Sequence, residues 1–123
     1  MNRQQYIDYC RNEFGTSPDY PFDDALMTAV LRHAYNRKWY ALIMNVPKSK
    51  LGIKSEERAD VVNLKLPVQM IDSFGAEDGV YPAYHMNKMH WVSVLLDSAD
   101  DSTVKFLTNA SFSVTKPKIV KKK

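Results

Sequence analysis

The stretch AYHMNKMHWVSVLLD, residues 83–97, decides the fold. In its second half two sets of side chains alternate along the chain: Trp91, Ser93 and Leu95 in one set, Val92, Val94 and Leu96 in the other. Alternation with a period of two is the pattern of a β-strand whose two faces differ. Residues 90–97 are therefore predicted to form a strand, and the polar residues before them to form the connection into it.

The remaining patterns place helices and further strands around that strand. Asn2 with Gln5 resembles a capping box, and the spacing of Tyr6, Cys10 and Phe14 predicts a helix that Gly15 can end. Strands are predicted at 27–35, 39–46, 61–66 and 80–84, a short helix at 67–75, and a last helix from 100 or 101 to about 114. The stretch 47–60 has no apolar periodicity and is expected to be an exposed, mobile connection.

This order of elements, α-β(3)-α-β(2)-α, contains hairpins and no regular βαβ alternation. It predicts an α+β fold in which helices cover an antiparallel sheet as a two-layer sandwich. At 123 residues the chain has the length of one domain. We expect that domain to span residues 1–115 and a basic, flexible tail to span residues 116–123.

The net charge of +3 comes from the tail. The chain has 17 basic and 14 acidic residues, and five of the lysines lie after residue 115, which leaves residues 1–115 with 12 basic against 14 acidic groups. These tail lysines are Lys116, Lys118, Lys121, Lys122 and Lys123. Such a tail can hold a phosphate backbone in a salt-dependent way or simply be a solvated end.

The usual signatures of catalysis and cofactor binding are missing from the sequence. The four glycines are isolated, so no phosphate-binding loop can be built, and the three histidines lack the spacing of a metal site. Cys10 is the only cysteine and is expected to be a small buried residue of a helix. We therefore expect no enzyme activity, no cofactor and no metal. The charged start and the lack of a long apolar run indicate a cytoplasmic protein without membrane contact.

The polar half of the opening stretch is the candidate site. His85, Asn87, Lys88 and His90 lie within six positions, and the hairpin turn at Asn36 adds Arg37 and Lys38. Cations, amides and imidazoles suit contacts with phosphates and nucleobases. The alternative is that Asn and Lys only turn the chain. We also expect His85 and Asn87 to hydrogen-bond the backbone, and Trp91 to be mostly buried.

Several stretches together resemble the MmcQ/YjbR family of small bacterial proteins, which are labelled DNA-binding: PFD at 21–23, the predicted hairpin at 27–46, VNLKL at 62–66, YHMNKMHWVSVLLD at 84–97 and NASF at 109–112. The resemblance implies the fold shared with type III secretion chaperones. The residues that match the family motif are Pro21, Phe22, Asp23, Tyr84, His85, Asn87, Lys88, His90, Trp91 and Asp97. Of these, Pro21, Phe22, Asp23, Tyr84, Trp91 and Asp97 are interpreted as structural.

Two functions remain open at this point. The first is a module that binds double-stranded DNA, in which Lys88, His85, Arg37 and Lys38 meet phosphates. The second is a protein-interaction or chaperone-like module, a monomer or weak homodimer, which uses the sheet face or an edge strand to hold a partner. The net charge of residues 1–115 argues against the first, and fold analogy alone supports the second.

Overall fold

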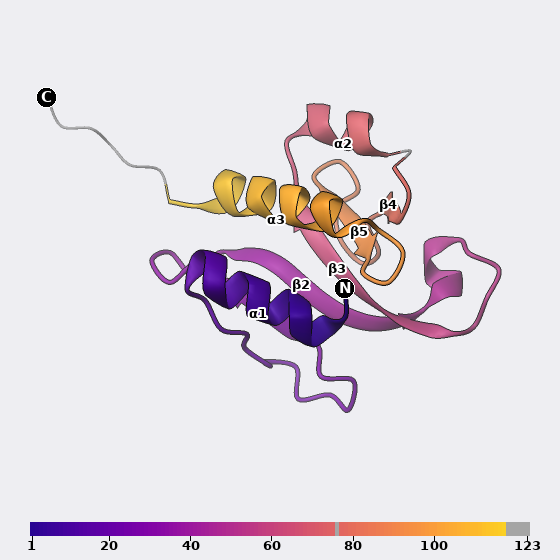
Figure 1. Ribbon diagram of the computed structural model, residues 1–123, viewed down its shortest axis with the longest axis horizontal. Helices are drawn as coiled ribbons and strands as arrows, with labels where there is room; N and C mark the ends of the chain where they lie inside the picture. Colours follow the sequence, from indigo (N-terminus) through magenta and orange to yellow (C-terminus); the bar gives the residue numbers. More distant parts are fainter. Residues whose placement is uncertain (76, 118–123) are drawn as a thin grey trace, which may run out of the picture.

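The structure is a computed structural model in which residues 1–75 and 77–117 are described (Figure 1). Its elements are α1 (Arg3–Phe14), β1 (Ala29–Arg32), β2 (Trp39–Pro47), the 3-10 helix η1 (Lys48–Leu51), β3 (Arg58–Lys65), α2 (Val68–Phe74), β4 (Val80–Pro82), β5 (Trp91–Leu95) and α3 (Asp101–Thr115). The predicted order of helices and strands is confirmed. The boundaries differ from the prediction most at β1, which is shorter at both ends.

The first helix forms for the reasons that its sequence gives. The Asn2 side chain accepts a hydrogen bond from the Gln5 backbone N–H, and the Gln5 side chain accepts one from the Asn2 N–H, both at 2.8 Å. Gly15 ends the helix in the left-handed conformation, with φ at 69°. Cys10 is fully buried, as expected, and burial raises the pKa of its thiol to about 11.

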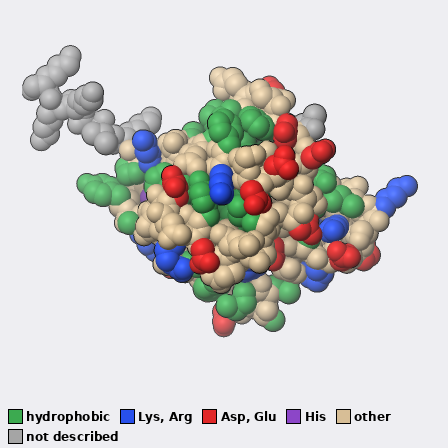
Figure 2. All heavy atoms as spheres, in the orientation of Figure 1, with side chains coloured by type: hydrophobic (Ala, Val, Ile, Leu, Met, Phe, Trp, Pro, Cys, Tyr) green, Lys and Arg blue, Asp and Glu red, His purple; other side chains and the backbone are tan. Residues whose placement is uncertain are grey.

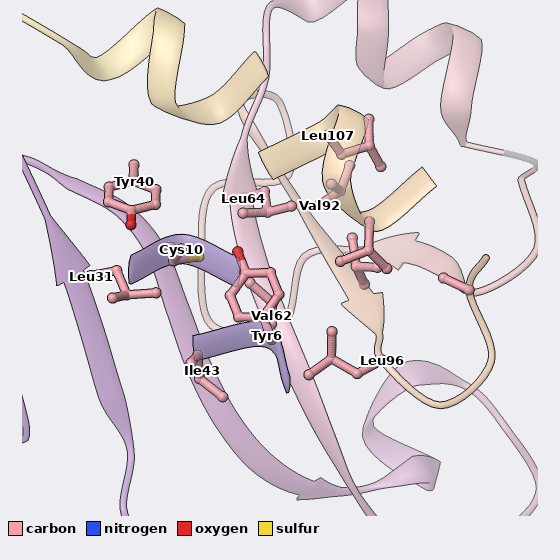
Figure 3. Packing of buried hydrophobic residues seen from close by; sticks show 14 of the residues in the cluster. Tyr6, Cys10, Leu31, Tyr40, Ile43, Val62, Leu64, Val92, Leu96 and Leu107 are labelled. Carbon is pink, nitrogen blue, oxygen red and sulfur yellow. The ribbon is translucent and has the colours of Figure 1, made fainter. Parts of the chain in front are cut away.

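The five strands form one antiparallel sheet in the order β1-β2-β3-β5-β4. Helices α1 and α3 lie side by side on one face of it, and the main apolar core fills the space between the two layers (Figures 1 and 3). The predicted α+β sandwich is thus confirmed. Along β5, Val92 and Val94 point into this core, whereas Leu95 belongs to a second cluster on the other face.

The second cluster covers the sheet face that the helices leave uncovered. Its buried members are Val30, Leu42, Met44, Val46, Leu51, Ala59, Val61 and Leu95. Loop side chains pack over it, among them Ile53, Tyr84 and Met86. The expectation of an exposed, mobile connection at 47–60 is therefore wrong for Leu51 and Ala59, which are buried, and for the ends of the stretch, which belong to strands. Strands β2 and β3 pair as far as Pro47 and Arg58, and Leu51 is buried because it packs on this cluster.

A β-bulge at Tyr40 adjusts the first hairpin. Leu31 pairs with Ala41 and Arg32 pairs with Trp39, so Tyr40 is an extra residue in β2. The bulge places the Tyr40 ring in the main core, where it meets the edge of the Phe14 ring. Burial raises the pKa of the Tyr40 hydroxyl, so this group stays neutral in the folded protein.

Among the described residues, no helix combines the length and apolar character that crossing a bilayer requires.

Candidate functional site

The two connections that carry the predicted site residues lie at the same end of the sheet. The β1–β2 turn spans residues 33–38, and the β4–β5 connection spans residues 83–90. Arg32 pairs with Trp39 across the hairpin, and Lys65 at the end of β3 pairs with Trp91 at the start of β5. We call this end, made of residues 32–39, 65–66, 82–91 and 115–117, the turn end. All six predicted binding side chains are exposed on it.

The β4–β5 connection is held by a buried polar group from two strands. Ser93 of β5 accepts a hydrogen bond from the Tyr84 backbone N–H at 2.9 Å and donates one to the Asn63 side chain. Asn63 of β3 in turn donates to the Tyr84 carbonyl at 2.8 Å. Both Asn63 and Ser93 have no exposed surface. They therefore replace a strand neighbour for Tyr84 and fix where the exposed turn begins.

Within that connection the prediction for Asn87 is confirmed and the one for His85 is wrong. The Asn87 side chain accepts a hydrogen bond from the Met89 N–H at 2.8 Å, and the backbone carbonyl of Asn87 accepts hydrogen bonds from the His90 and Trp91 N–H groups. His85 has φ at 61°, and its ring lies 3.9 Å from the Tyr84 ring. No hydrogen bond forms between the His85 ring and a described residue, and the backbone N–H and C=O of Tyr84 are bonded by Ser93 and Asn63 instead.

Most of the surface of Trp91 is covered, as expected. It is the first residue of β5 and keeps a minor part of its surface exposed. It faces the same side of the sheet as its pairing partner, Lys65. An indole and a lysine stem thus lie on adjacent strands at the turn end.

The β1–β2 turn is held by the end of α3. The Asn36 side chain donates to the Thr115 carbonyl at 3.3 Å and accepts from the Lys38 N–H at 3.1 Å. His33 is buried, and its Nε2 lies 2.8 Å from the Thr115 hydroxyl. Burial lowers the pKa of His33, and the nearby Lys116 and Lys38 lower it further. The imidazole is therefore held neutral in the interior and is unsuited to contact a ligand.

Basic residues outnumber acidic ones at the turn end. They are Arg32, Arg37, Lys38, Lys65, Lys88 and Lys116. The acidic neighbours are Asp19, which pairs with Arg32 at 2.9 Å and with Arg37 at 3.2 Å, and Glu13 in the last turn of α1. Within the described part of the chain the four lysines form no ion pair. Their charge is thus available to an anionic partner.

The opposite end of the sheet carries most of the acidic residues. The connections at 20–28, 48–57, 77–79 and 96–101 all lie there, since they precede β1 and β4 or follow β2 and β5. They hold Asp23, Asp24, Glu56, Glu57, Glu77, Asp78, Asp97, Asp100 and Asp101. On the face drawn in Figure 2, many of the acidic side chains lie from the centre to the right, and several basic side chains lie among them. The 12 basic and 14 acidic groups of residues 1–115 are therefore unevenly distributed: basic residues are in excess at the turn end, and acidic residues exceed the lysines Lys48, Lys50 and Lys54 in these four connections.

Not all of the family-motif residues join the candidate site. Asp97 follows β5 at the opposite end, where its carboxylate lies 3.9 Å from Lys48. Pro21, Phe22 and Asp23 are exposed in the segment before β1, and the Phe22 ring meets the Trp39 ring edge-on at 6.1 Å. The interpretation of these residues as structural stays a prediction, and none of them contacts the 83–90 connection through a described hydrogen bond or ion pair.

Sequence reasoning missed two residues of the turn end, Lys65 and Tyr35, and one beside it, Asp19. Lys65 is one of the alternating residues of a predicted strand, so its own sequence position gives no sign of a site. Only the pairing of β3 with β5 places it beside Trp91. Asp19 lies in a Pro-rich loop, and its two ion pairs depend on the fold. Tyr35 belonged to a predicted strand, but the structure places it in the turn with 89% of its surface exposed. The turn-forming residues Asn36, Arg37 and Lys38 beside it were the signal that could have placed Tyr35 in the turn.

The residues described offer no metal site and no well-formed ligand cavity. No cluster of three His, Cys, Asp or Glu side chains occurs among them. A polar depression of about 500 Å³ lies at the opposite end, lined in part by Asn45, Arg58 and Asp60. Its polar groups already bond one another: Arg58 donates to Asn45 at 2.8 Å, and Asn45 donates to Asp60 at 3.2 Å. Arg3 completes the group through a 3.2 Å ion pair with Asp60.

Comparison with known proteins gives a consistent picture. A family model described as YjbR matches residues 14–114. The uncharacterized protein YyaQ of Bacillus subtilis is 38% identical over 117 residues, which cover 94% of this chain and 99% of that protein. A crystal structure of a Pseudomonas syringae protein superposes with a TM-score of 0.90 at 44% identity, and covers 94% of this chain and 100% of that one.

A more distant structure shares the fold alone. The crystal structure of a Deinococcus radiodurans protein with a DUF419 domain superposes with a TM-score of 0.66 at 24% identity. The match covers 98% of this chain and 83% of that one. The five-stranded sheet with its helices is thus found at low sequence identity as well.

Proposed function

The chain belongs to the YjbR family, and from the charge distribution of its turn end we propose that it binds DNA there. The observation that supports this most is the uneven distribution of charge: basic residues outnumber acidic ones at the turn end, whereas acidic residues outnumber the lysines Lys48, Lys50 and Lys54 in the connections at the opposite end. A polyanion would approach the first end and be repelled by the second. The proposal assigns the protein no catalytic role.

The lysines lie at or near the ends of three neighbouring strands. Lys38 directly precedes β2, Lys65 ends β3, and Lys88 lies just before β5. Because β2, β3 and β5 are adjacent and strands in a sheet lie about 4.8 Å apart, the three backbones form a row across the turn end. Long lysine side chains from such a row can reach successive phosphates of one strand.

Binding of this kind is expected to be weak and salt-dependent. Asp19 neutralises part of the charge of Arg32 and Arg37, so the lysines supply most of the attraction. If roughly two to four phosphates are neutralised, the logarithm of the affinity falls with the logarithm of salt concentration at a slope of about −2 to −4. The exposed amide of Asn87 and the His85 and His90 rings can add hydrogen bonds to phosphate or base edges.

A charge-reversal experiment tests the location of the site. Lys38→Glu with Lys88→Glu removes two cations from the turn end, and Lys50→Glu with Lys54→Glu makes the same change of charge at the opposite end. Measured by fluorescence anisotropy on a labelled duplex at low salt, the first pair of substitutions should weaken binding at least about tenfold and reduce the salt slope by about 2. The second pair should have a much smaller effect. Equal losses would show that only net charge matters.

The tail needs its own control. Lys118, Lys121, Lys122 and Lys123 lie outside the described residues, and the predicted flexible tail remains a prediction. Replacing these lysines with serine should lower the affinity while leaving the difference between the two double variants in place. If this replacement alone abolishes binding, the folded turn end is not the site.

A protein-interaction role is the second candidate, and one observation favours it. The segment before β1 exposes four large apolar side chains: Tyr20, Phe22, Leu26 and Met27. The sheet itself offers less, because loops pack over its second face, β4 has three residues, and β1 is bridged by Asp19 at Val30. A self-association that Phe22→Ser abolishes would support this candidate. A monomer at every concentration in light scattering would count against the homodimer.

A further inference from the structure

Tyr35 is the most exposed large hydrophobic side chain in the described part of the protein. It lies in the β1–β2 turn with 89% of its surface in water. No aromatic ring and no described cation lies over it. Burial stabilises by roughly 25 cal/mol for each Å² of apolar surface removed from water, and an exposed ring contributes none of this; a turn position also accepts a small polar residue. No described contact of the Tyr35 ring therefore explains a tyrosine at this position by the stability of the fold.

The backbone around Tyr35 is fixed. The His33 N–H donates to the Lys38 carbonyl at 2.9 Å, and the Arg37 N–H donates to the His33 carbonyl at 3.0 Å. Arg37 adopts the left-handed conformation, with φ at 62°, and its side chain is held by Asp19. Asn36 ties the turn to the end of α3 at Thr115. The ring is therefore presented on a rigid support, which lowers the entropic cost of binding on it.

The turn around Tyr35 carries the groups that recognise a phosphate. Lys38 is exposed and forms no described ion pair, and Lys116 follows the helix end to which the turn is bonded. An unpartnered aromatic ring beside cations is the arrangement that stacks on a nucleobase while the cations hold its backbone. We propose that Tyr35 stacks on an unpaired base, so that the turn end prefers single-stranded over fully paired DNA.

The preference follows from the accessibility of bases. In a duplex the faces of the bases are covered by their neighbours, and a ring can reach them only at an end or by opening a step. In a single strand every base offers its face. Phosphates are present in both forms, so the lysines attract both, whereas Tyr35 contributes to the single strand alone. This inference rests on the proposed function and adds its ligand class.

The test separates stacking from charge with two probes of equal charge. One is a labelled thymidine oligonucleotide, and the other is the same sugar-phosphate chain with abasic sites in place of most bases. The intact protein should bind the thymidine strand about 5- to 150-fold more tightly than the abasic one. Tyr35→Ala should lose that preference, and Tyr35→Phe should keep it, because the ring and not the hydroxyl stacks.

Further variants and a duplex probe complete the test. Phe106→Ala removes another exposed aromatic ring, from the outer side of α3, and should leave the preference unchanged. Tyr35→Ala should also leave unaltered the binding of a long duplex, in which few bases lie at an end, and the salt slope of that binding. If the intact protein binds DNA but does not distinguish the thymidine from the abasic strand, or if Tyr35→Ala keeps the distinction, the stacking inference is wrong and the proposed function stands. If the intact protein binds none of the probes at low salt, the proposed function itself is wrong.

Discussion

The two connections at the turn end are built alike locally and anchored differently. In each, an asparagine side chain accepts a hydrogen bond from the backbone N–H two residues later: Asn36 from Lys38, and Asn87 from Met89. Each also holds one non-glycine residue at positive φ, Arg37 in the first and His85 in the second. The first connection is tied to the end of α3, and the second to buried side chains of β3 and β5.

The difference shows how a short polar turn acquires a defined position. A local Asx turn shapes the chain, but it does not fix where the turn lies on the protein. The position of each turn is fixed by hydrogen-bond partners that are distant in sequence: Thr115 for the first turn, and Asn63 with Ser93 for the second. The second anchor is fully buried and the first is only partly so. Breaking the buried anchor should therefore cost more stability.

The largest effect is expected from Ser93→Ala. The substitution removes a hydroxyl without creating a large cavity, and it leaves the Tyr84 N–H and the Asn63 side-chain oxygen without their partner. Because unpaired buried polar groups cost about 1–3 kcal/mol each, the free energy of unfolding should fall by about 2–4 kcal/mol in a urea titration. Ser98→Ala, at an exposed position just after β5, is the matched control and should change it little. Equal effects of the two substitutions would show that the buried group does not hold the connection.

A smaller effect is expected from Asn36→Ala. This removes the bond to Thr115 and the acceptor of the Lys38 N–H, both near the surface, so the loss should be about 1 kcal/mol. Hydrogen exchange of the Lys38 amide should accelerate. Exchange of the Met89 amide, held by the equivalent Asn87, should stay as it is. Acceleration at both amides would mean that the two turns are coupled and not anchored separately.

The smallest effect is expected from pH, through His33 beside the first anchor. The pKa of the folded imidazole is lowered by burial, while the unfolded chain takes up a proton near the usual value of about 6.5. The unfolded state thus binds more protons once the pH falls below about 6.5, and stability should decline from there until the folded pKa is passed. Urea midpoints between pH 7.5 and 5.5 measure this. His33→Gln should show a flatter profile, and an identical one would exclude His33 as the source.

Much of the fold could be predicted because several of its elements have local sequence signals. The capping box at Asn2, the spacing of Tyr6 and Cys10, and the alternation along 91–96 are local signals, and the structure confirms each. The ladder of β2 with β3 up to Pro47 and Arg58 was missed because the polar residues there pair through their backbone. The burial of Leu51 was missed because it depends on a cluster assembled from distant segments.

The candidate site was less predictable. Exposure of Arg37, Lys38 and Lys88 could be expected from turn residues, and the structure places all three at the turn end. Lys65 and Tyr35 could not be assigned, because strand order and the real end of β1 decide where they lie. The expectation that the His85 ring bonds the backbone was wrong: the side chains that bond the backbone of the adjacent Tyr84 are those of Asn63 and Ser93, which come from two strands. Position in the fold, and not residue type, decided these cases.

The most direct test of DNA binding at the turn end is to map the amide resonances that change when DNA is added. Backbone amide spectra of the protein should be recorded at low salt with increasing amounts of a short oligonucleotide, single-stranded and duplex in turn. We predict that the shifts concentrate in residues 32–39, 65–66, 83–91 and 115–117. Shifts that concentrate in residues 20–28 or 48–57, or no shifts at all, would contradict the account.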